Sequence, residues 1–410
     1  MKAGSDGDEH VSIDGAPPLA ATADQCSEEP HAEALSPVVA VPETGAGRYV
    51  LLEPLRAIAA LMVLGYHVYL RSSPDPENAW DIGRLLNLGV PIFFVLSGFL
   101  LYRPFASARL DGRRMPSIGR YAKRRFFRVI PGYWVALSVF ALLIPAWVDV
   151  LDQDAWIYYG LVQTWVPGHT FGGLSPAWSL SVELAFYLLL PFYALALDRV
   201  LRRRSRRSQL TIEAAILCAA AVFTLVARRF LFGGGDGPAG FLVWSLLGHL
   251  DWFAAGMALA LVTIVWVDDP ERPRLVRFVE QRAGACWAAA VGLFLLLGFV
   301  VGNPGDILHV AGVVIALLLV SPAVLGDPSS GRARRLLSLP VMAGLGVVSY
   351  GIFLWNEPIA VWLHSRDLDD WGFVDGTPVL LGLTLVLTIG AAVLGYVLVE
   401  RPMVAFSRKE

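Results

Sequence analysis

Stretches of about 20 mostly apolar residues recur along the whole chain, and they constrain its fold more than any other feature. A helix of that length crosses the hydrocarbon core of a bilayer, which is about 30 Å thick. A helix on a soluble domain would show a polar face at helical period, and most of these stretches show none. The sequence therefore predicts an all-α integral membrane protein with about ten transmembrane helices, near residues 50–70, 86–105, 130–148, 178–197, 210–232, 244–267, 285–302, 307–326, 341–363 and 378–399.

Composition agrees with this class and excludes others. Hydrophobic residues make up 56% of the 410 residues and charged residues 17%, whereas soluble domains hold about 25% charged residues. The three cysteines cannot form a disulfide framework, and the histidines and cysteines show no metal-ligand spacing, so we expect no metal. Basic residues lie next to the predicted spans, which gives nucleic-acid binding no support.

The first 47 residues differ from the rest. They hold nine acidic residues against one basic residue, Lys2, and are rich in Pro, Ala, Gly and Ser. Such a segment buries too little apolar area to offset its ordering entropy. We predict a disordered acidic tail at 1–47, a membrane domain at 48–405 and a short cytoplasmic tail at 406–410.

Loop charges predict the orientation. With ten spans, one side of the membrane carries 24 Arg and Lys residues and the other side only Arg71, Arg84 and Arg366. Because cytoplasmic loops carry the excess of positive charge, both termini are predicted to be cytoplasmic. Arg228 and Arg229 are exceptions near the outer end of the fifth span, where they either snorkel to the interface or line a cavity.

Ionisable residues inside spans are costly and mark candidate functional positions. Arg56 and His67 lie 11 residues apart in the first span, which places them on one helical face about 16 Å apart. Glu183 in the fourth span lies at a predicted depth similar to that of His67, so the two can pair. The alternative for each residue is structural: Arg56 as an interfacial residue and His67 as a hydrogen bonder in helix packing.

The segment 149–177, between the third and fourth predicted spans, is long and aromatic and contains no basic residue. Its middle part, 156–165, is amphipathic enough to lie in the membrane interface. Two interpretations stay open: an aromatic belt element, or a lid over an outward-facing site.

Six motifs in order give the chain a specific resemblance over residues 48 to about 405. They are Arg56 with ten residues to His67, Phe93-Phe94-x-x-Ser97-Gly98, Arg125-Phe-Phe-Arg128 followed by Ile130-Pro131, Trp178-Ser-Leu-Ser-Val-Glu183, Ser349-Tyr350 through Leu354-Trp355, and Glu400-Arg401-Pro402. The chain resembles the acyltransferase 3 family of membrane O-acyltransferases, which modify sugars, peptidoglycan and lipopolysaccharide.

The resemblance implies a cytoplasmic acyl-CoA donor, with acetyl the acyl group that the family favours, and an acceptor hydroxyl that is often outside. It implies essential roles for Arg56 and His67 and a donor-binding role for Arg125 and Arg128. The alternative for Arg125 and Arg128 is that they are a topology signal, which would be sufficient to explain their charges. The chain departs from the pattern at Asn356, where the family usually has His. Some relatives carry a hydrolase-like domain after the last span, and we expect none here because the sequence stops about ten residues past Glu400.

Acyl transfer from a thioester to an alcohol needs a base or a nucleophile, and His67 can be either, with Glu183 orienting it. The tetrahedral oxyanion needs hydrogen-bond donors, which Ser97, Asn356 or Arg56 could supply. Further candidates for lining the substrate site are Ser181, Tyr350 and Asp251.

The sequence thus predicts an enzyme of the bacterial cell membrane that acylates a hydroxyl of a sugar, glycolipid, cell-wall unit or secondary metabolite, with no bound cofactor. The alternative is a proton-coupled transporter or flippase, since ten spans with buried ionisable residues would suit a carrier. Against it, the two halves show no inverted repeat and no paired broken helices. A purely structural membrane protein would leave the shared face of Arg56 and His67 unexplained.

Overall fold

The computed structural model describes residues 49–72, 82–144, 150, 153–233, 239–267, 269–299, 305–326, 331–366 and 377–408. The tail predicted at 1–47 lies outside these residues, and residues 406–408 continue the last helix. The described residues form helices and contain no β-strand.

Sixteen α-helices follow one another along the described chain, with short 3₁₀ and π segments between some of them. Their bounds are α1 Leu52–Ser72, α2 Ile82–Leu85, α3 Gly89–Leu110, α4 Ile118–Leu143, α5 Ala155–Tyr159, α6 Ala177–Leu201, α7 Arg206–Val226, α8 Leu250–Trp266, α9 Arg274–Gln281, α10 Ala283–Gly298, α11 Gly305–Leu325, α12 Arg332–Leu337, α13 Pro340–Val347, α14 Ser349–His364, α15 Thr377–Gly395 and α16 Arg401–Arg408.

Each predicted apolar stretch falls on one or more of these helices. Within the described ranges, six helical segments are long and apolar enough to cross a membrane, or seven if α9 and α10, which meet at 86°, form one span. The shorter helix α8 is also apolar. The chain is a multi-pass membrane protein. The lower count has local causes: α1 carries Glu53, Arg56 and Arg71 and is not among these segments, α8 has only 17 residues, and the ninth stretch is divided between α13 and α14.

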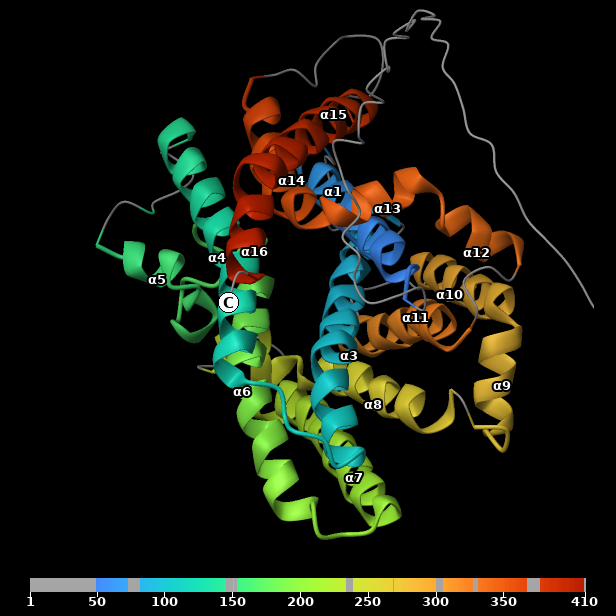
Figure 1. Cartoon of the computed structure of the whole chain (residues 1–410). Coiled ribbons are helices and arrows are strands. Elements are labelled where there is room, and N and C mark those ends of the chain that lie inside the picture. Colours follow the sequence, from blue (N-terminus) through green and yellow to red (C-terminus); the bar gives the residue numbers. More distant parts are fainter. Residues whose placement is uncertain are drawn as a thin grey trace, which may run out of the picture. The chain divides into compact units, whose positions relative to one another are not determined.

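Helix α3 lies against α1, α6, α8 and α11, and α1 packs along α14, which in turn packs along α15 (Figure 1). The closest approach is between α3 and α8. A Cβ atom at Gly98 would lie 2.3 Å from the carbonyl oxygen of Phe253, and one at Gly256 would lie 2.1 Å from that of Val95. The absence of a side chain at Gly98, in the second predicted span, therefore allows the backbones of α3 and α8 to approach closely, as small residues do in other membrane bundles.

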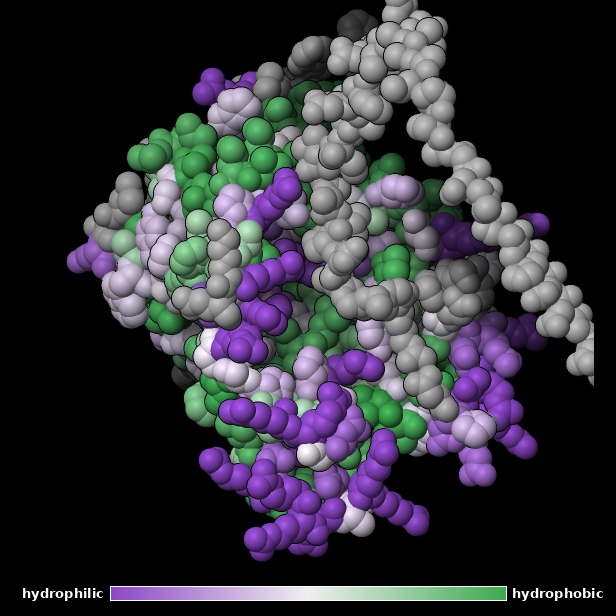
Figure 2. Space-filling model, in the orientation of Figure 1, coloured by the Kyte–Doolittle hydropathy of each residue, from purple (hydrophilic) through white to green (hydrophobic). Residues whose placement is uncertain are grey.

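A buried ion pair ties the far end of α3 to the start of α7. Arg109 pairs with Glu213 and donates to Gln209 Oε1 at 2.7 Å, and the side chains of Arg109 and Glu213 are 1% and 0% exposed. Hydrophilic residues gather on the surface near this end of α6 and α7, in the lower part of the view (Figure 2). Arg109 is one of the 24 basic residues assigned to the positively charged side from the sequence, and the structure shows that its side chain holds two helices together.

The segment that follows α4 is held in place by hydrogen bonds. Tyr133 donates to the carbonyl of Tyr158 at 2.8 Å, and Trp134 donates to the carbonyl of Tyr159 at 2.9 Å. Trp156 remains 63% exposed on this segment, as expected for an aromatic residue at a membrane interface.

The contact between α3 and α8 predicts the effect of one methyl group. Gly98→Ala places its Cβ against backbone rather than against a flexible side chain, so the helices must separate. Overpacking of this kind costs about 1–3 kcal/mol. We expect a lower melting temperature for the detergent-solubilised variant in a fluorescence-detected thermal assay.

The matched control is Gly292→Ala in α10, where an added Cβ meets no described atom within 4 Å. It should melt at or above the wild-type temperature, since Ala is the better helix former. Equal melting temperatures for the two variants would show that the α3–α8 contact is looser than described.

Candidate active site

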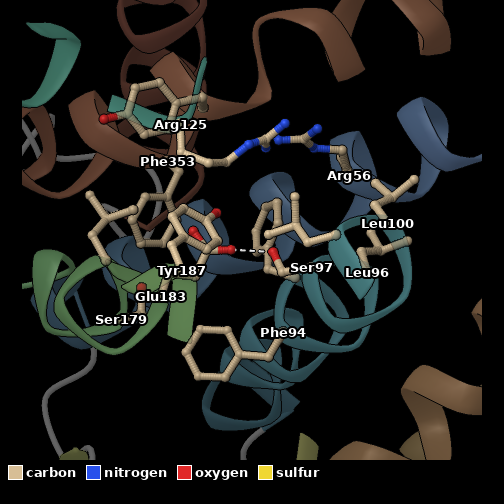
Figure 3. A pocket seen from close by; sticks show the side chains of 14 residues that line it. Arg56, Phe94, Leu96, Ser97, Leu100, Arg125, Ser179, Glu183, Tyr187 and Phe353 are labelled. Atoms are coloured by element: carbon tan, nitrogen blue, oxygen red, sulfur yellow. Dashed lines mark hydrogen bonds between the residues drawn. The ribbon is translucent and has the colours of Figure 1, made fainter. Parts of the chain in front are cut away.

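A cavity of about 640 Å³, counting the open space at its mouth, lies among α1, α3, α4, α6 and α14 (Figure 3). Polar and charged side chains occupy one part of its wall and apolar rings the rest. The residues that line it are Arg56, Phe93, Phe94, Leu96, Ser97, Leu100, Leu101, Arg125, Ser179, Leu180, Glu183, Tyr187, Tyr350 and Phe353. Five of the residues predicted from sequence, Arg56, Ser97, Arg125, Glu183 and Tyr350, are therefore brought together here.

Two arginines face one another across the cavity. Arg56 extends from the first turns of α1 and Arg125 from α4, and their guanidinium groups point toward each other (Figure 3). Arg56 lies 4.0 Å from Glu53, so its nearest described carboxylate is too far for a short hydrogen bond. Arg128 lies within electrostatic range of both arginines but does not line the cavity. Paired guanidinium groups of this kind suit an anion with several oxygens, such as a phosphate.

Opposite the arginines, the hydroxyl of Ser97 donates to the carboxylate of Glu183 (Figure 3). Tyr187, one helical turn after Glu183, lies within hydrogen-bonding reach of the same carboxylate. Arg56 and Arg125 are both within electrostatic range of Glu183. The carboxylate is therefore held by α3 and α6, and it balances part of the positive charge of the cavity.

The ring of Tyr350 forms part of the cavity wall, and its hydroxyl donates to the carbonyl of Val129 at 2.6 Å. That bond fixes α14 against α4 and leaves the ring, rather than the hydroxyl, to contact a ligand. Phe93 and Phe353 meet edge to face at 5.9 Å between ring centroids. The apolar part of the wall suits an uncharged chain or an acyl group.

His67 does not line the cavity; it lies farther along α1 and bonds to α14. Its Nδ1 is 2.7 Å from Asn356 Oδ1. The amide nitrogen of Asn356 donates to the carbonyls of Ile352 and Phe353 at 2.9 and 2.7 Å, so Oδ1 is the acceptor. His67 Nδ1 must then carry the hydrogen, and Nε2 of the neutral ring keeps its lone pair. This arrangement presets the tautomer in which Nε2 can act as a base or a nucleophile.

An ion pair lies beside this histidine. Arg71, at the last turn of α1, donates to Glu357 at 2.9 Å, and Glu357 follows Asn356 in α14. Two bonds between side chains, His67 to Asn356 and Arg71 to Glu357, therefore fix the end of α1 on α14.

The expected pairing of His67 with Glu183 does not occur. The carboxylate bonds to Ser97, and Asn356 is the residue that orients His67. Residue spacing gives the position along one helix but not which side chains of other helices lie beside it: Glu183 lines the cavity with Arg56, and His67 lies farther along α1 against α14. Asn356 is also not an oxyanion donor here, since both of its N–H groups are taken by backbone carbonyls.

Two further predicted residues lie elsewhere. Ser181 is 1% exposed and bonds to Thr164 at 2.7 Å, so it fastens the segment between α5 and α6 instead of lining the cavity. Asp251 lies at the start of α8 and pairs with His309 at 2.8 Å. Sequence reasoning missed Tyr187, for which the one-turn spacing from Glu183 was an available signal, and His309, an ionisable residue in an apolar stretch.

A helical membrane bundle with a charged cavity, and with an oriented histidine on a helix that lines this cavity, fits the class of membrane-embedded enzymes. A sequence model described as an acyltransferase domain matches residues 51–397. The chain belongs to the acyltransferase 3 family, and it is an O-acyltransferase.

The relatives carry names of the same kind. The chain is 28% identical to a protein of Komagataeibacter xylinus named as a membrane-bound transacylase, over 85% of this chain and 81% of that one. It is 26% identical to the peptidoglycan O-acetyltransferase OatA of Listeria monocytogenes, over 75% of this chain and 49% of that one. It is 24% identical to a protein of Staphylococcus aureus named as an O-acetyltransferase, over 86% of this chain and 56% of that one.

The chain thus spans about half the length of the latter two relatives. No solved structure matches the chain significantly.

Proposed function

We propose that the protein transfers an acyl group, acetyl by preference, from cytoplasmic acyl-CoA to a hydroxyl of a glycan, glycolipid, cell-wall unit or secondary metabolite, in the plasma membrane of a bacterium. The observation that carries this proposal is the sequence of groups along one face of α1. Arg56 lines the cavity, and His67, with its lone pair on Nε2, follows about 16 Å farther along the helix.

The proposed acyl-CoA donor would extend from the arginines of the cavity toward His67. Arg56 and Arg125 would bind the phosphates of acyl-CoA, with Arg128 adding positive charge behind them. The pantetheine arm of CoA is a long flexible chain, which could lie along the apolar wall and present the thioester beyond the arginines. Relatives named for O-acetyl transfer and transacylation support acetyl as the group and a hydroxyl as the acceptor.

The chemistry requires one base. His67 Nε2 would take the proton of the acceptor hydroxyl as its oxygen attacks the thioester carbon, forming the C–O bond. The C–S bond then breaks, and the proton passes to the leaving thiolate, giving CoA and the ester. Alternatively, His67 takes the acyl group first as a nucleophile. Arg56, about 16 Å from His67 along α1, binds phosphate in this scheme and does not serve the oxyanion.

Glu183 has a different role in this scheme. Its bonds to Ser97 and Tyr187 hold it inside the cavity, within electrostatic range of both arginines. We propose that it positions the guanidinium groups when the donor is absent and lines the donor site when it is present.

Ten spans with both termini in the cytoplasm remain the topology that we propose. Arg109 and Arg334 are buried and belong to the packing of helix ends, but leaving them out does not remove the excess of positive loop charge. The cavity arginines would then lie on the cytoplasmic side, where acyl-CoA is found.

The role of His67 is tested by replacing the base without removing the hydrogen bond. His67→Gln should lower turnover by about 10²–10⁴-fold, the value of a general base. Asn356→Ala removes only the hydrogen bond that orients the His67 ring, so it should lower turnover by about 10²-fold or less. The measurement is transfer of labelled acetyl from CoA to a cell-envelope fraction, in membranes with equal amounts of each variant.

His364→Gln, at the exposed end of α14, is the matched control and should retain wild-type turnover. If His67→Gln keeps more than about a tenth of wild-type turnover, His67 is neither base nor nucleophile.

Donor binding is tested by Arg125→Ala. Loss of a phosphate contact is loss of uniform binding, so the donor KM should rise while kcat changes less. Arg124→Ala is the control, because its exposed side chain does not line the cavity. An unchanged donor KM for Arg125→Ala would leave this arginine as a topology signal only.

Topology is tested by single cysteines at Gln153 and Ser205 in a variant that lacks the three native cysteines. Both positions are exposed, and the proposed topology places them on opposite sides. An impermeant maleimide added to intact cells should label Gln153→Cys and not Ser205→Cys, and the reverse pattern would overturn the orientation.

A further inference from the structure

A second hollow, called here the basic groove, lies apart from the cavity at the ends of α3 and α6. Its volume is about 1310 Å³, counting the open space at its mouth. It is formed by the loop that follows α3, the last turns of α6 and the residues just after α6. The residues that line it are Arg113, Arg114, Met115, Pro116, Leu195, Asp198, Arg199, Arg202 and Arg203. Hydrophilic residues gather on the surface around this end of α6 (Figure 2).

The basic groove carries an excess of positive charge, since five arginines and one carboxylate line it. The carboxylate, Asp198, pairs with Arg202 at 2.8 Å, and Arg113 pairs with Asp111 outside the groove at 2.7 Å. Three exposed arginines form no ion pair with any residue in the described ranges: Arg114, Arg199 and Arg203. An anion can therefore bind here without displacing an existing partner.

An apolar strip of α6 leads to the basic groove. Leu188 and Phe192 are 62% and 65% exposed. At 100° per residue, their side chains and that of Arg199 lie within about 40° of one another around the helix axis. Leu188 is about 16 Å from Arg199 along that axis. One face of α6 thus runs from exposed apolar side chains to the arginines of the groove.

The basic groove lies at the depth of lipid headgroups. The helical segments Ile82–Leu110 and Ala177–Leu201 are both long and apolar enough to cross a membrane, and both end beside it. The exposed strip of α6 lies within the second of these segments, where it would face the hydrocarbon. In the topology proposed above, the groove is on the cytoplasmic side, where anionic lipids give the leaflet its negative surface potential.

We propose that the basic groove binds an anionic phospholipid. The headgroup phosphate contacts Arg114, Arg199 and Arg203, and one acyl chain lies along Leu188 and Phe192. Arginine suits this task because its planar guanidinium group can bond to two phosphate oxygens at once, and basic pockets between transmembrane helices bind such headgroups. A free phosphate would leave the apolar strip unused. A topology signal requires the charges but neither the groove nor the strip.

The test is the double variant Arg199→Ala/Arg203→Ala. The detergent-solubilised full chain is titrated with phosphatidylglycerol, and bound lipid is counted by native mass spectrometry. Loss of two arginines at the membrane surface should weaken phosphatidylglycerol binding by about 30-fold. Phosphatidylcholine with the same acyl chains has no net charge and should bind the wild-type protein more weakly than phosphatidylglycerol does.

The matched control is Arg206→Ala/Arg207→Ala, at the start of α7. It removes the same charge from the same end of the bundle, and both side chains are exposed and do not line the basic groove. Its affinity for phosphatidylglycerol should stay at the wild-type value.

Three results would overturn the proposal. An equal effect of the two double variants, or no effect of either, would show that the lipid does not bind in the groove. Equal binding of phosphatidylglycerol and phosphatidylcholine would show that the arginines do not select the headgroup. Displacement of phosphatidylglycerol by inorganic phosphate at the same concentration would identify a site for small anions instead of a lipid site.

Discussion

Polar side chains inside this helical bundle must find partners within the protein, because a hydrocarbon environment offers none. Three pairs that join neighbouring helices meet this requirement among the described residues. Arg109 with Glu213 joins α3 to α7, Ser97 with Glu183 joins α3 to α6, and His67 with Asn356 joins α1 to α14. The first of these pairs holds helix ends together, and the other two form the candidate site. The need to pair buried polar side chains thus accounts both for contacts between helix ends and for the arrangement of the candidate site.

The site divides into parts that share α1. At one end, Arg56 and Arg125 offer positive charge to an anionic donor, and Glu183 offsets part of that charge in their neighbourhood. Farther along the helix, Asn356 fixes the ring of His67 so that Nε2 keeps its lone pair. The resemblance led us to expect His at the position of Asn356, and the amide that stands there orients the ring of His67 and cannot itself titrate. An acyl-CoA donor that extends from Arg56 and Arg125 to His67 would occupy both parts of the site at once.

The sequence was sufficient to predict the helical membrane class, the family, and most of the polar residues of the cavity, because charged residues in apolar stretches are conspicuous. It was not sufficient to predict partners. Glu183 was expected at the depth of His67, yet it lines the cavity with Arg56 and bonds to Ser97, whereas His67 bonds to Asn356. Ser181 was expected to line a substrate site, but its hydroxyl fastens a surface segment. The position along one helix follows from residue spacing. The depth of one helix relative to another, and its lateral neighbours, depend on close contacts such as those at Gly98 and Gly256, whose partner helices no local pattern specifies.

The central claim is that this bundle performs a covalent reaction rather than carrying a solute unchanged. The most direct measurement is the mass balance of the purified protein reconstituted in vesicles with acetyl-CoA and an envelope glycan fraction. Free CoA thiol and acetylated glycan are quantified together by colorimetry and mass spectrometry. The account predicts that one acetyl ester forms for each thiol released, and that both products depend on the protein. Movement of an unmodified solute across the vesicle membrane, with no thiol released and no ester formed, would contradict it and identify the protein as a carrier.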